Sequence, residues 1–291
     1  MLTSLKYIFI SMRPAQWVKN LFIFAGLIFS RNLFNAESFL SVSSGFVIFS
    51  LGASSIYILN DVKDLKNDKL HPEKCRRPLP SGMISVPMAY ATALVLGCGS
   101  LSAAFILNQA FFWILAAYIA MNIGYSLWLK HVVILDVMCI AFGFVFRVLA
   151  GTELAKVWAS DWLLICTVTV SLFLGFSKRR SEVALLEGES SKHRSVLAHY
   201  SLPFLDQMIA VATACTVMSY ALYTVADETV VRFGTRNLVL TMPFVLYGIY
   251  RYLYLIHEKK AGGNPSRLVF DDKPLLLNCF LWVVATLIII Y

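Results

Sequence analysis

The stretch that decides the fold is Asn60 to Gly82, NDVKDLKNDKLHPEKCRRPLPSG, which directly follows the apolar run 39–59. That run is long enough to cross a bilayer as a helix. The carboxylates of Asp61, Asp64 and Asp68 are spaced by three and then four residues. On a continuous helix they would share one face, with Asn60 at its edge. A densely charged segment therefore begins where a membrane-crossing segment ends.

Carboxylates that point the same way suit a diphosphate that carries Mg²⁺, because this ion prefers one or two protein carboxylates together with phosphate oxygens and water. The metal ligands predicted from this pattern are Asp61, Asp64 and Asp68. The cations expected to bind the phosphate charge are Lys74, Arg76 and Arg77. The alternative is a face that is merely solvated at the membrane boundary, but such a face has no reason to align its carboxylates.

The composition of the chain places the whole protein in a membrane. Of its 291 residues, 58% are hydrophobic, and the mean hydropathy is +0.70, which is too apolar for a soluble globular protein. About nine apolar segments approach the ~20 residues of a spanning helix. They are 17–34, 39–59, 86–107, 111–129, 132–151, 161–177, 204–226, 238–256 and 275–291. The sequence predicts one all-α transmembrane domain over residues 1–291, a polytopic helix bundle.

The Lys and Arg residues orient this bundle. With the N-terminus in the cytoplasm, twenty of the 25 lie on the cytoplasmic side, four lie on the opposite side and Arg147 lies within a span. The positive-inside rule then predicts a cytoplasmic N-terminus and an external C-terminus, in a bacterial cytoplasmic membrane. The net charge of +8 follows from these flanking loops. We therefore expect a lipid bilayer as partner and no nucleic acid.

A few charged residues in or near the spans need partners. Asp136 lies one turn inside the segment 132–151, where a carboxylate is usually paired or lines a polar cavity. Lys130 is the nearest candidate partner, so a purely structural Lys130–Asp136 ion pair is one interpretation. Arg147 lies about 16 Å further along the helix and is expected to reach the outer interface or to bond within the bundle. For Asp271 and Asp272 there are two interpretations, capping of the last helix, which we favour, and a place in the site.

The charged stretch resembles the first Asp-rich motif of the UbiA superfamily of intramembrane prenyltransferases. The matching residues are Asn60-Asp61-x-x-Asp64-x-x-x-Asp68, His71-Pro72 and Arg77-Pro78-Leu79-Pro80-Ser81-Gly82. The chain departs from the second Asp-rich motif of that superfamily. The cations Lys178, Arg179 and Arg180 stand there, and Glu182 and Glu187 are the carboxylates that remain. We expect a cationic pocket in place of a second metal clamp, although a plain topology signal is the alternative.

Within the superfamily, the chain is most similar to decaprenyl-phosphate phosphoribosyltransferases. The resemblance rests on three further motifs, Arg13-Pro14-x-Gln16-Trp17-Val18-Lys19-Asn20, Tyr125-Ser126-x-x-Leu129-Lys130 with Asp136-Val137, and Lys178-Arg179-Arg180-x-Glu182. It implies transfer of 5-phosphoribose from phosphoribosyl diphosphate to a polyprenyl phosphate, with release of diphosphate. The reaction would be assisted by Mg²⁺ and would take place at the cytoplasmic membrane face.

The same resemblance implies roles for individual polar residues. The catalytic residues expected are Asp61, Asp64, Lys130 and Asp136. The substrate-binding residues expected are Asn60, Lys19, Lys74, Arg76, Arg77, Tyr125, Lys178, Arg179 and Arg180. For Lys19, ordinary anchoring at the membrane interface is an equally good interpretation. No general base is needed, since a lipid phosphate is already ionised near neutral pH.

Two other functions remain open at this point. A prenyltransferase of the same fold would attach a polyprenyl diphosphate to an aromatic quinone or haem precursor, but it would be expected to carry the second Asp-rich motif. A transporter or a lipid-binding membrane protein is the alternative from another class. Transporters place their sites near the middle of the bilayer, whereas the charges of this chain gather at one membrane face.

Overall fold

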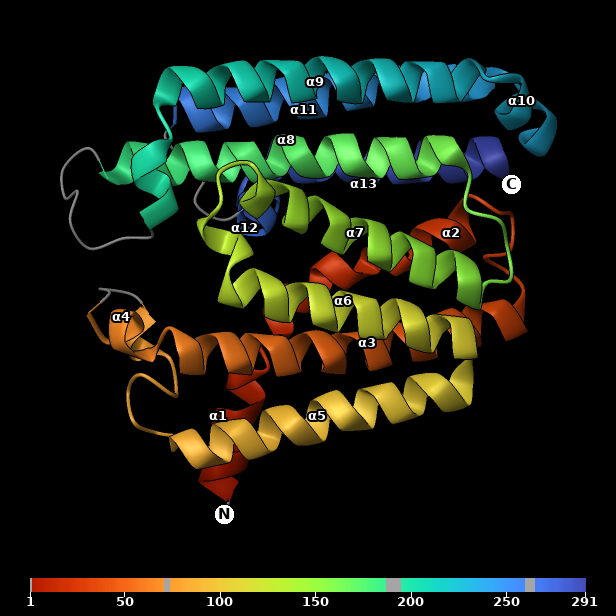
Figure 1. Ribbon diagram of the computed structural model, residues 1–291. Coiled ribbons are helices and arrows are strands. Elements are labelled where there is room, and N and C mark those ends of the chain that lie inside the picture. Colours follow the sequence, from red (N-terminus) through yellow and green to blue (C-terminus); the bar gives the residue numbers. More distant parts are fainter. Residues whose placement is uncertain (1, 71–73, 187–194, 260–264) are drawn as a thin grey trace. The chain divides into compact units, whose positions relative to one another are not determined.

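The computed structural model describes residues 2–70, 74–186, 195–259 and 265–291, and every regular element in these ranges is a helix (Figure 1). Within them, eight helices are long and apolar enough to cross a membrane. They are α3 (Ala36–Lys63), α5 (Val86–Leu107), α6 (Gln109–Leu127), α7 (Leu135–Leu154), α8 (Asp161–Leu186), α9 (Leu202–Val225), α11 (Met242–His257) with the preceding η5 (Asn237–Thr241), and α13 (Lys273–Ile290). The predicted all-α, polytopic membrane fold is confirmed.

The chain divides into two compact units. Unit 1 comprises residues 1–130 and 146–158, and unit 2 comprises residues 131–145 and 159–291. Helix α7 therefore contributes its first turns to unit 2 and its last turns to unit 1. The single domain predicted over residues 1–291 stays a prediction.

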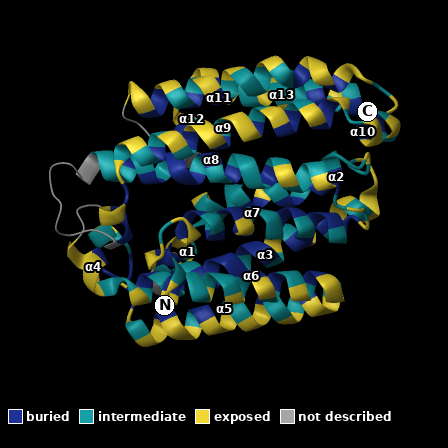
Figure 2. Ribbon diagram, turned by 45° about the horizontal axis from the view of Figure 1, so that its top comes forward, coloured by how far each residue is buried: buried dark blue, intermediate teal, exposed yellow. Residues whose placement is uncertain are grey.

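Unit 1 is built around α3, which packs against α5 and α6. Its core contains Phe49 on α3 and Phe111 and Leu115 on α6, all fully buried. In the apolar membrane-spanning stretch of α3, 56% of the residues are buried. In the corresponding stretch of α5, only 17% are. Figure 2 shows the same contrast, with more dark blue along α3 than along α5, which is largely yellow and teal. The charged stretch of the sequence follows the central helix of this unit.

The first apolar segment crosses unit 1 without forming one long helix. After α1 (Leu2–Ser11), the chain forms the 3₁₀ helix η1 (Pro14–Ile23) and the short α2 (Phe24–Ile28). Arg13 contacts Asp61, Trp17 Nε1 donates to Ser54 at 3.1 Å, and Asn20 Nδ2 donates to Ser50 at 2.8 Å. The partners on α3 step backward as the segment advances, so it runs antiparallel to α3 from the end of that helix toward its start.

Close packing and buried polar bonds explain this irregular course. A Cβ atom at Gly151 of α7 would lie 1.7 Å from the carbonyl oxygen of Ile23, so the two backbones touch where only glycine fits. Arg147 Nε donates to Asn20 Oδ1 at 2.7 Å, and its Nη2 donates to Tyr118 at 3.1 Å. Arg147 thus bonds within the bundle, which is one of the two alternatives predicted for its side chain.

Unit 2 contains two packed helix pairs, α8 with α9 and α11 with α13, and α9 also contacts α11 (Figure 1). Phe173, Leu205 and Tyr252 lie in its buried core. The short α10 (Asp227–Phe233) follows α9, and α12 (Pro265–Asp271) precedes α13.

The cap predicted for the last helix is present in unit 2. Asp272 Oδ1 accepts a hydrogen bond from Leu275 N at 2.9 Å. Its carboxylate also pairs with Arg251 at 2.9 Å, and this contact lowers the pKa of Asp272. Capping is thus confirmed for Asp272, whereas Asp271 is the last residue of α12.

Candidate active site

The Asp-rich stretch lies at the end of α3, but it is not one continuous helical face. Helix α3 ends at Lys63, Asp64 is its C-terminal cap with φ −89° and ψ 7°, and a separate helix α4 (Leu65–Leu70) follows. The prediction that Asp61, Asp64 and Asp68 share one helix face is therefore wrong in detail. The interruption at Asp64 sends its carboxylate to a different cation from the other two.

Arg77 joins two of the three carboxylates. Its Nη1 lies 3.0 Å from Asp61 Oδ1 and 3.0 Å from Asp68 Oδ2, and both aspartates are at least 95% buried. A tight turn presents this arginine, since Ser81 N donates to the Arg77 carbonyl at 3.0 Å and Gly82 has φ 80°. The positive φ explains why glycine ends the Pro-Leu-Pro-Ser-Gly sequence.

Two further cations complete the surroundings of Asp61 and Asp68. Arg13 pairs with Asp61 and lies over the ring of Tyr57, 5.5 Å from its centroid. Burial lowers the pKa of Arg13, and the charge of Asp61 opposes that shift. Lys74, in the short η2 (Lys74–Arg76), approaches Asp68 at 3.7 Å.

Asp64 pairs with Lys130 instead. Lys130, in η3 (Leu129–His131), is 94% buried, and its Nζ lies 2.8 Å from Asp64 Oδ1. The neighbouring Asn60 accepts a hydrogen bond from Ser126 on α6. The sequence offered Asp136 as the partner of Lys130, whereas the ion-pair partner within unit 1 is Asp64. Below, the Asp-rich cluster means Asp61, Asp64 and Asp68 with their cations Arg13, Lys74, Arg77 and Lys130.

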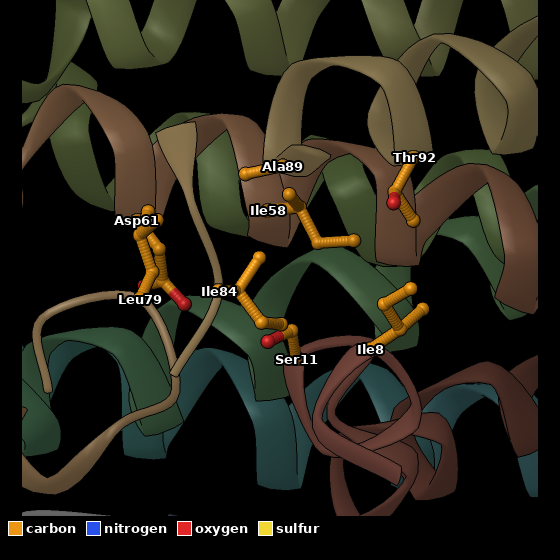
Figure 3. A pocket seen from close by; sticks show the side chains of 8 residues that line it. All are labelled: Ile8, Ser11, Ile58, Asp61, Leu79, Ile84, Ala89 and Thr92. Carbon is orange, nitrogen blue, oxygen red and sulfur yellow. The ribbon is translucent and has the colours of Figure 1, made fainter. Parts of the chain in front are cut away.

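A small cleft beside Asp61 is mainly apolar. It lies between α1, α3, the loop after Arg77 and α5, and Ile8, Ile58 and Ile84 are among the residues that line it (Figure 3). Asp61 is the charged residue in this lining. An apolar wall beside a carboxylate strengthens its attraction to cations by lowering the local dielectric constant.

The Asp-rich cluster fits a magnesium ion through two carboxylates better than through three. Among the residues that the structure describes, no three acidic, histidine or cysteine side chains form a potential metal site. Asp61 and Asp68 nevertheless approach the same cation, the Arg77 guanidinium. Two carboxylates are enough, because Mg²⁺ takes its other ligands from phosphate and water. The predicted set of three metal ligands is not assembled here, while the donor chemistry suits the ion.

In unit 2, Asp136 and Arg179 form a buried network with two neighbours. Arg179 Nε donates to Asp136 Oδ2 at 2.6 Å, and its Nη1 donates to Glu182 at 2.5 Å. Tyr200 donates to Asp136 Oδ1 at 2.6 Å. The pKa of its phenol is raised, mainly by burial and secondly by this hydrogen bond. Asp136 and Arg179 have no exposed surface. This geometry differs from the direct substrate contact predicted for these two residues, since neither side chain reaches solvent.

Arg179 is one of the α8 triplet, the three consecutive cations Lys178, Arg179 and Arg180, and the other two point to separate partners. Arg180 Nε donates to Asp206 on α9 at 2.5 Å, while Lys178 Nζ lies 3.7 Å from Glu182. Each member of the triplet therefore has a carboxylate nearby, and the expected excess of positive charge is partly balanced. Lys178 keeps about a third of its side chain exposed.

The remaining predicted substrate-binding residues are spread over unit 1. Lys19 is half-buried on η1, Tyr125 is half-buried on α6 next to Ser126, and Arg76 is exposed beside Arg77. Their roles stay predictions. His71, Pro72 and Glu187, which were part of the sequence patterns, lie outside the described residues.

Sequence reasoning left two residues out of the predicted site that the structure places in these networks, Ser126 and Tyr200. It considered Arg13 only as a phosphate contact and not as a partner of Asp61. Ser126 stands inside a motif that carried the resemblance, so its position offered a signal. Tyr200 offered none, because its partner Asp136 is 64 residues away along the chain.

Similarity to known proteins agrees with this picture. Residues 20–284 match the UbiA prenyltransferase family. The chain is 32% identical to a decaprenyl-phosphate phosphoribosyltransferase of Corynebacterium glutamicum, over 97% of this chain and 86% of that protein. It is 31% identical to a decaprenyl-phosphate phosphoribosyltransferase of Mycobacterium tuberculosis, over 94% of this chain and 90% of that one.

A solved structure shows the same fold. A UbiA homologue from Archaeoglobus fulgidus bound to GPP and Mg²⁺ superimposes with a TM-score of 0.74. The alignment covers 98% of this chain and 99% of the homologue, at 18% sequence identity. At this level of identity, the likeness supports the helical architecture and leaves the substrates to be argued from the residues.

Proposed function

Because this chain belongs to the UbiA prenyltransferase family, we propose that it transfers 5-phosphoribose from phosphoribosyl diphosphate to a polyprenyl phosphate and releases diphosphate. Family membership makes the protein a transferase, and the eight apolar helices in the described part of the chain make it an integral membrane protein. The identity of the substrates is the proposed part. It is supported by the activity named for the curated relatives, which align over most of this chain.

The observation that carries the proposal is the charge balance of the Asp-rich cluster. Its three carboxylates are matched by four cations, two arginines and two lysines, brought together from the N-terminal segment, α3, α4, η2 with the loop that follows it, and η3. Both proposed substrates are polyanions, and arginine and lysine bind phosphate through charge-assisted hydrogen bonds. A neutral aromatic acceptor would have little use for so many cations.

We propose that Asp61 and Asp68 hold Mg²⁺ with the donor diphosphate, and that Asp64 supports them from the end of α3. A bound ion would neutralise charge on the leaving diphosphate. Arg77, which now joins the two carboxylates, would turn to phosphate oxygens as the carboxylates take the metal. Arg13 would follow Asp61 in the same way.

The transfer itself needs positioning and charge stabilisation rather than a general base. An oxygen of the ionised lipid phosphate attacks C1 of the ribose, the bond from C1 to the diphosphate oxygen breaks, and diphosphate leaves with the bonding electrons. Arg13, Arg77 and Lys130 would stabilise the negative charge that develops on the leaving group. Asn60, held by Ser126, would orient a carboxylate or a bound water.

The polyprenyl chain and the membrane orientation complete the proposal. The Asp-rich stretch, the α8 triplet and most other cations lie on the side that the positive-inside rule assigns to the cytoplasm. We place the reaction at that face of the bacterial cytoplasmic membrane, where a soluble sugar donor is available. The polyprenyl tail would remain among apolar helices.

The test is to incubate the purified protein with Mg²⁺, labelled phosphoribosyl diphosphate and a polyprenyl phosphate in detergent. We expect label in the lipid phase together with release of diphosphate. Asp61→Asn protein is the matched control and should give neither. If the wild-type protein ignores this donor and transfers a prenyl group from a polyprenyl diphosphate to an aromatic acceptor, the other family activity is correct and the proposed substrates are wrong.

A further inference from the structure

The turn between η3 and α7 has an unusual backbone conformation at Ile134. This residue has φ 70°, in the left-handed region. A β-branched residue rarely adopts that conformation, because its branched side chain crowds the backbone. The Ile134 carbonyl nevertheless accepts bonds from Val137 N at 3.0 Å and Met138 N at 2.9 Å, so the residue starts α7. Such a conformation persists only where surrounding contacts hold it.

The hydroxyl of Tyr200 supplies such a contact. It accepts a hydrogen bond from Ile134 N at 2.7 Å and donates to Asp136 Oδ1 at 2.6 Å. Tyr200 follows η4 (Ser195–His199), is 95% buried, and stacks on Phe204 with ring centroids 6.1 Å apart. One side chain, far along the sequence, therefore bridges the strained residue and the carboxylate two positions later.

Asp136 orients that hydroxyl. Its Oδ1 accepts the Tyr200 proton, so the phenol oxygen presents a lone pair to the Ile134 N–H. Arg179 in turn holds the carboxylate from α8 through Oδ2. The three side chains form one connected network inside unit 2, and Tyr200 links this network to the backbone of the turn through Ile134 N.

We propose that Tyr200 is a positioning residue that holds residues 131–135 in this strained turn and thereby fixes the backbone that follows Lys130. Lys130, immediately before the turn, is buried and paired with Asp64 in the Asp-rich cluster. The conformational part of the proposal does not depend on which donor the enzyme uses. Its kinetic consequence rests on the proposed function.

Hydrogen exchange of the backbone amides tests the conformational part directly. In Tyr200→Phe protein, peptides that cover residues 131–138 should exchange about tenfold faster, because the bond to Ile134 N is lost. Peptides from α3 and α5 should keep their rates. Tyr220→Phe is the matched control, since this buried phenol in the same unit bonds Thr241 at 2.6 Å and Trp282 at 2.9 Å, away from the turn. It should leave peptides 131–138 unchanged.

A second variant separates positioning from general stabilisation. Ile134→Gly removes the backbone strain, because glycine adopts positive φ readily, and Ile134 is 40% exposed, so little packing is lost. In the Tyr200→Phe background this change should slow exchange of amides 135–138 again, whereas the amide of residue 134, which has lost its acceptor, should stay fast. If Tyr200→Phe does not fold, the wild-type protein still decides, since the proposal requires slow exchange at the Ile134 amide.

Activity completes the test. With the proposed substrates, Tyr200→Phe should lower kcat about tenfold and leave both KM values within about twofold, and Ile134→Gly should recover part of kcat. Unchanged exchange at 131–138 in Tyr200→Phe, or an equal increase throughout the chain, would overturn the positioning role. A wild-type enzyme without activity on these substrates would overturn the proposed function alone and leave the exchange result valid.

Discussion

Arg179 and Asp136 form a completely buried ion pair, with Arg179 Nε 2.6 Å from Asp136 Oδ2 and no exposed surface on either side chain. The pair joins α8 to the first turn of α7 across 43 residues of sequence. Taking both charges out of water is costly, and their attraction offsets that cost only while both are present. The pair is thus more informative about the specific packing of these helices than about net stability.

Breaking this pair should destabilise the protein strongly. We expect Arg179→Met to lower the free energy of unfolding by about 3–5 kcal/mol, because the Asp136 charge stays buried without its partner. The double replacement Arg179→Met with Asp136→Leu should recover most of the loss. Thermal unfolding in detergent measures both, and Arg232→Met, which removes an exposed pair with Glu228, should cost under about 1 kcal/mol. A single Arg179→Met variant as stable as wild type would contradict this.

Activity should require a divalent cation and the carboxylates at the end of α3. Asp61→Asn and Asp64→Asn should each abolish turnover and leave the protein folded. A chelator should likewise abolish turnover of the wild-type protein without unfolding it. At Asp61 the reason is that an amide binds Mg²⁺ far more weakly than a carboxylate does. At Asp64 the replacement removes the negative partner of the buried Lys130. Initial rates and size-exclusion profiles provide the measurement, with Asp227→Asn on α10 as control. Full activity in chelator would exclude the proposed metal site.

Arg77 should matter more than other cations near the Asp-rich cluster. Arg77→Ala removes the guanidinium that joins Asp61 and Asp68 and a proposed phosphate contact. A charge-assisted contact is worth about 1.5–3 kcal/mol, so KM for the sugar donor should rise about 10- to 150-fold. Steady-state kinetics on both substrates checks this, with the exposed Lys66→Ala on α4 as control. Equal effects of the two replacements would show that only the net charge matters.

Lys178 is the member of the α8 triplet best placed to contact substrate. It keeps exposed surface and lies 3.7 Å from its carboxylate, whereas Arg179 is buried and Arg180 is bound to Asp206. Lys178→Ala should raise KM for phosphoribosyl diphosphate about tenfold and change KM for the polyprenyl phosphate little, since the lipid binds mainly through apolar burial. Lys259→Ala is a surface control. Donor kinetics like those of wild type would make the triplet a topology signal.

Membrane orientation can be measured with single cysteines in a background without the native ones. A cysteine at exposed position Lys66 should resist an impermeant reagent added to intact cells, and one at exposed Arg236 should react. The expectation comes from the excess of Lys and Arg on one side of the spans. Labelling of the Lys66→Cys protein from outside would reverse the orientation and move the proposed reaction to the other face.

The sequence by itself determined the membrane class, the helical fold and the position of the charged stretch. Spanning helices can be recognised in the sequence because each needs its own run of about 20 apolar residues. The segment 86–107 became α5 with the same limits, and Asp272 caps α13 as predicted. These features depend on residues that are near one another in the chain, so local composition suffices to predict them.

Only the tertiary structure decided which charges meet. Arg13 reaches Asp61 over 48 residues and Lys130 reaches Asp64 over 66, whereas Lys130 and Asp136, which are close in sequence, have different partners. Ion pairs form between groups that packing brings within a few ångströms, and sequence spacing does not report that packing. The same reason explains the 3₁₀ course of η1, which depends on its close contact with Gly151, and the bond from Tyr200 to the strained turn at Ile134.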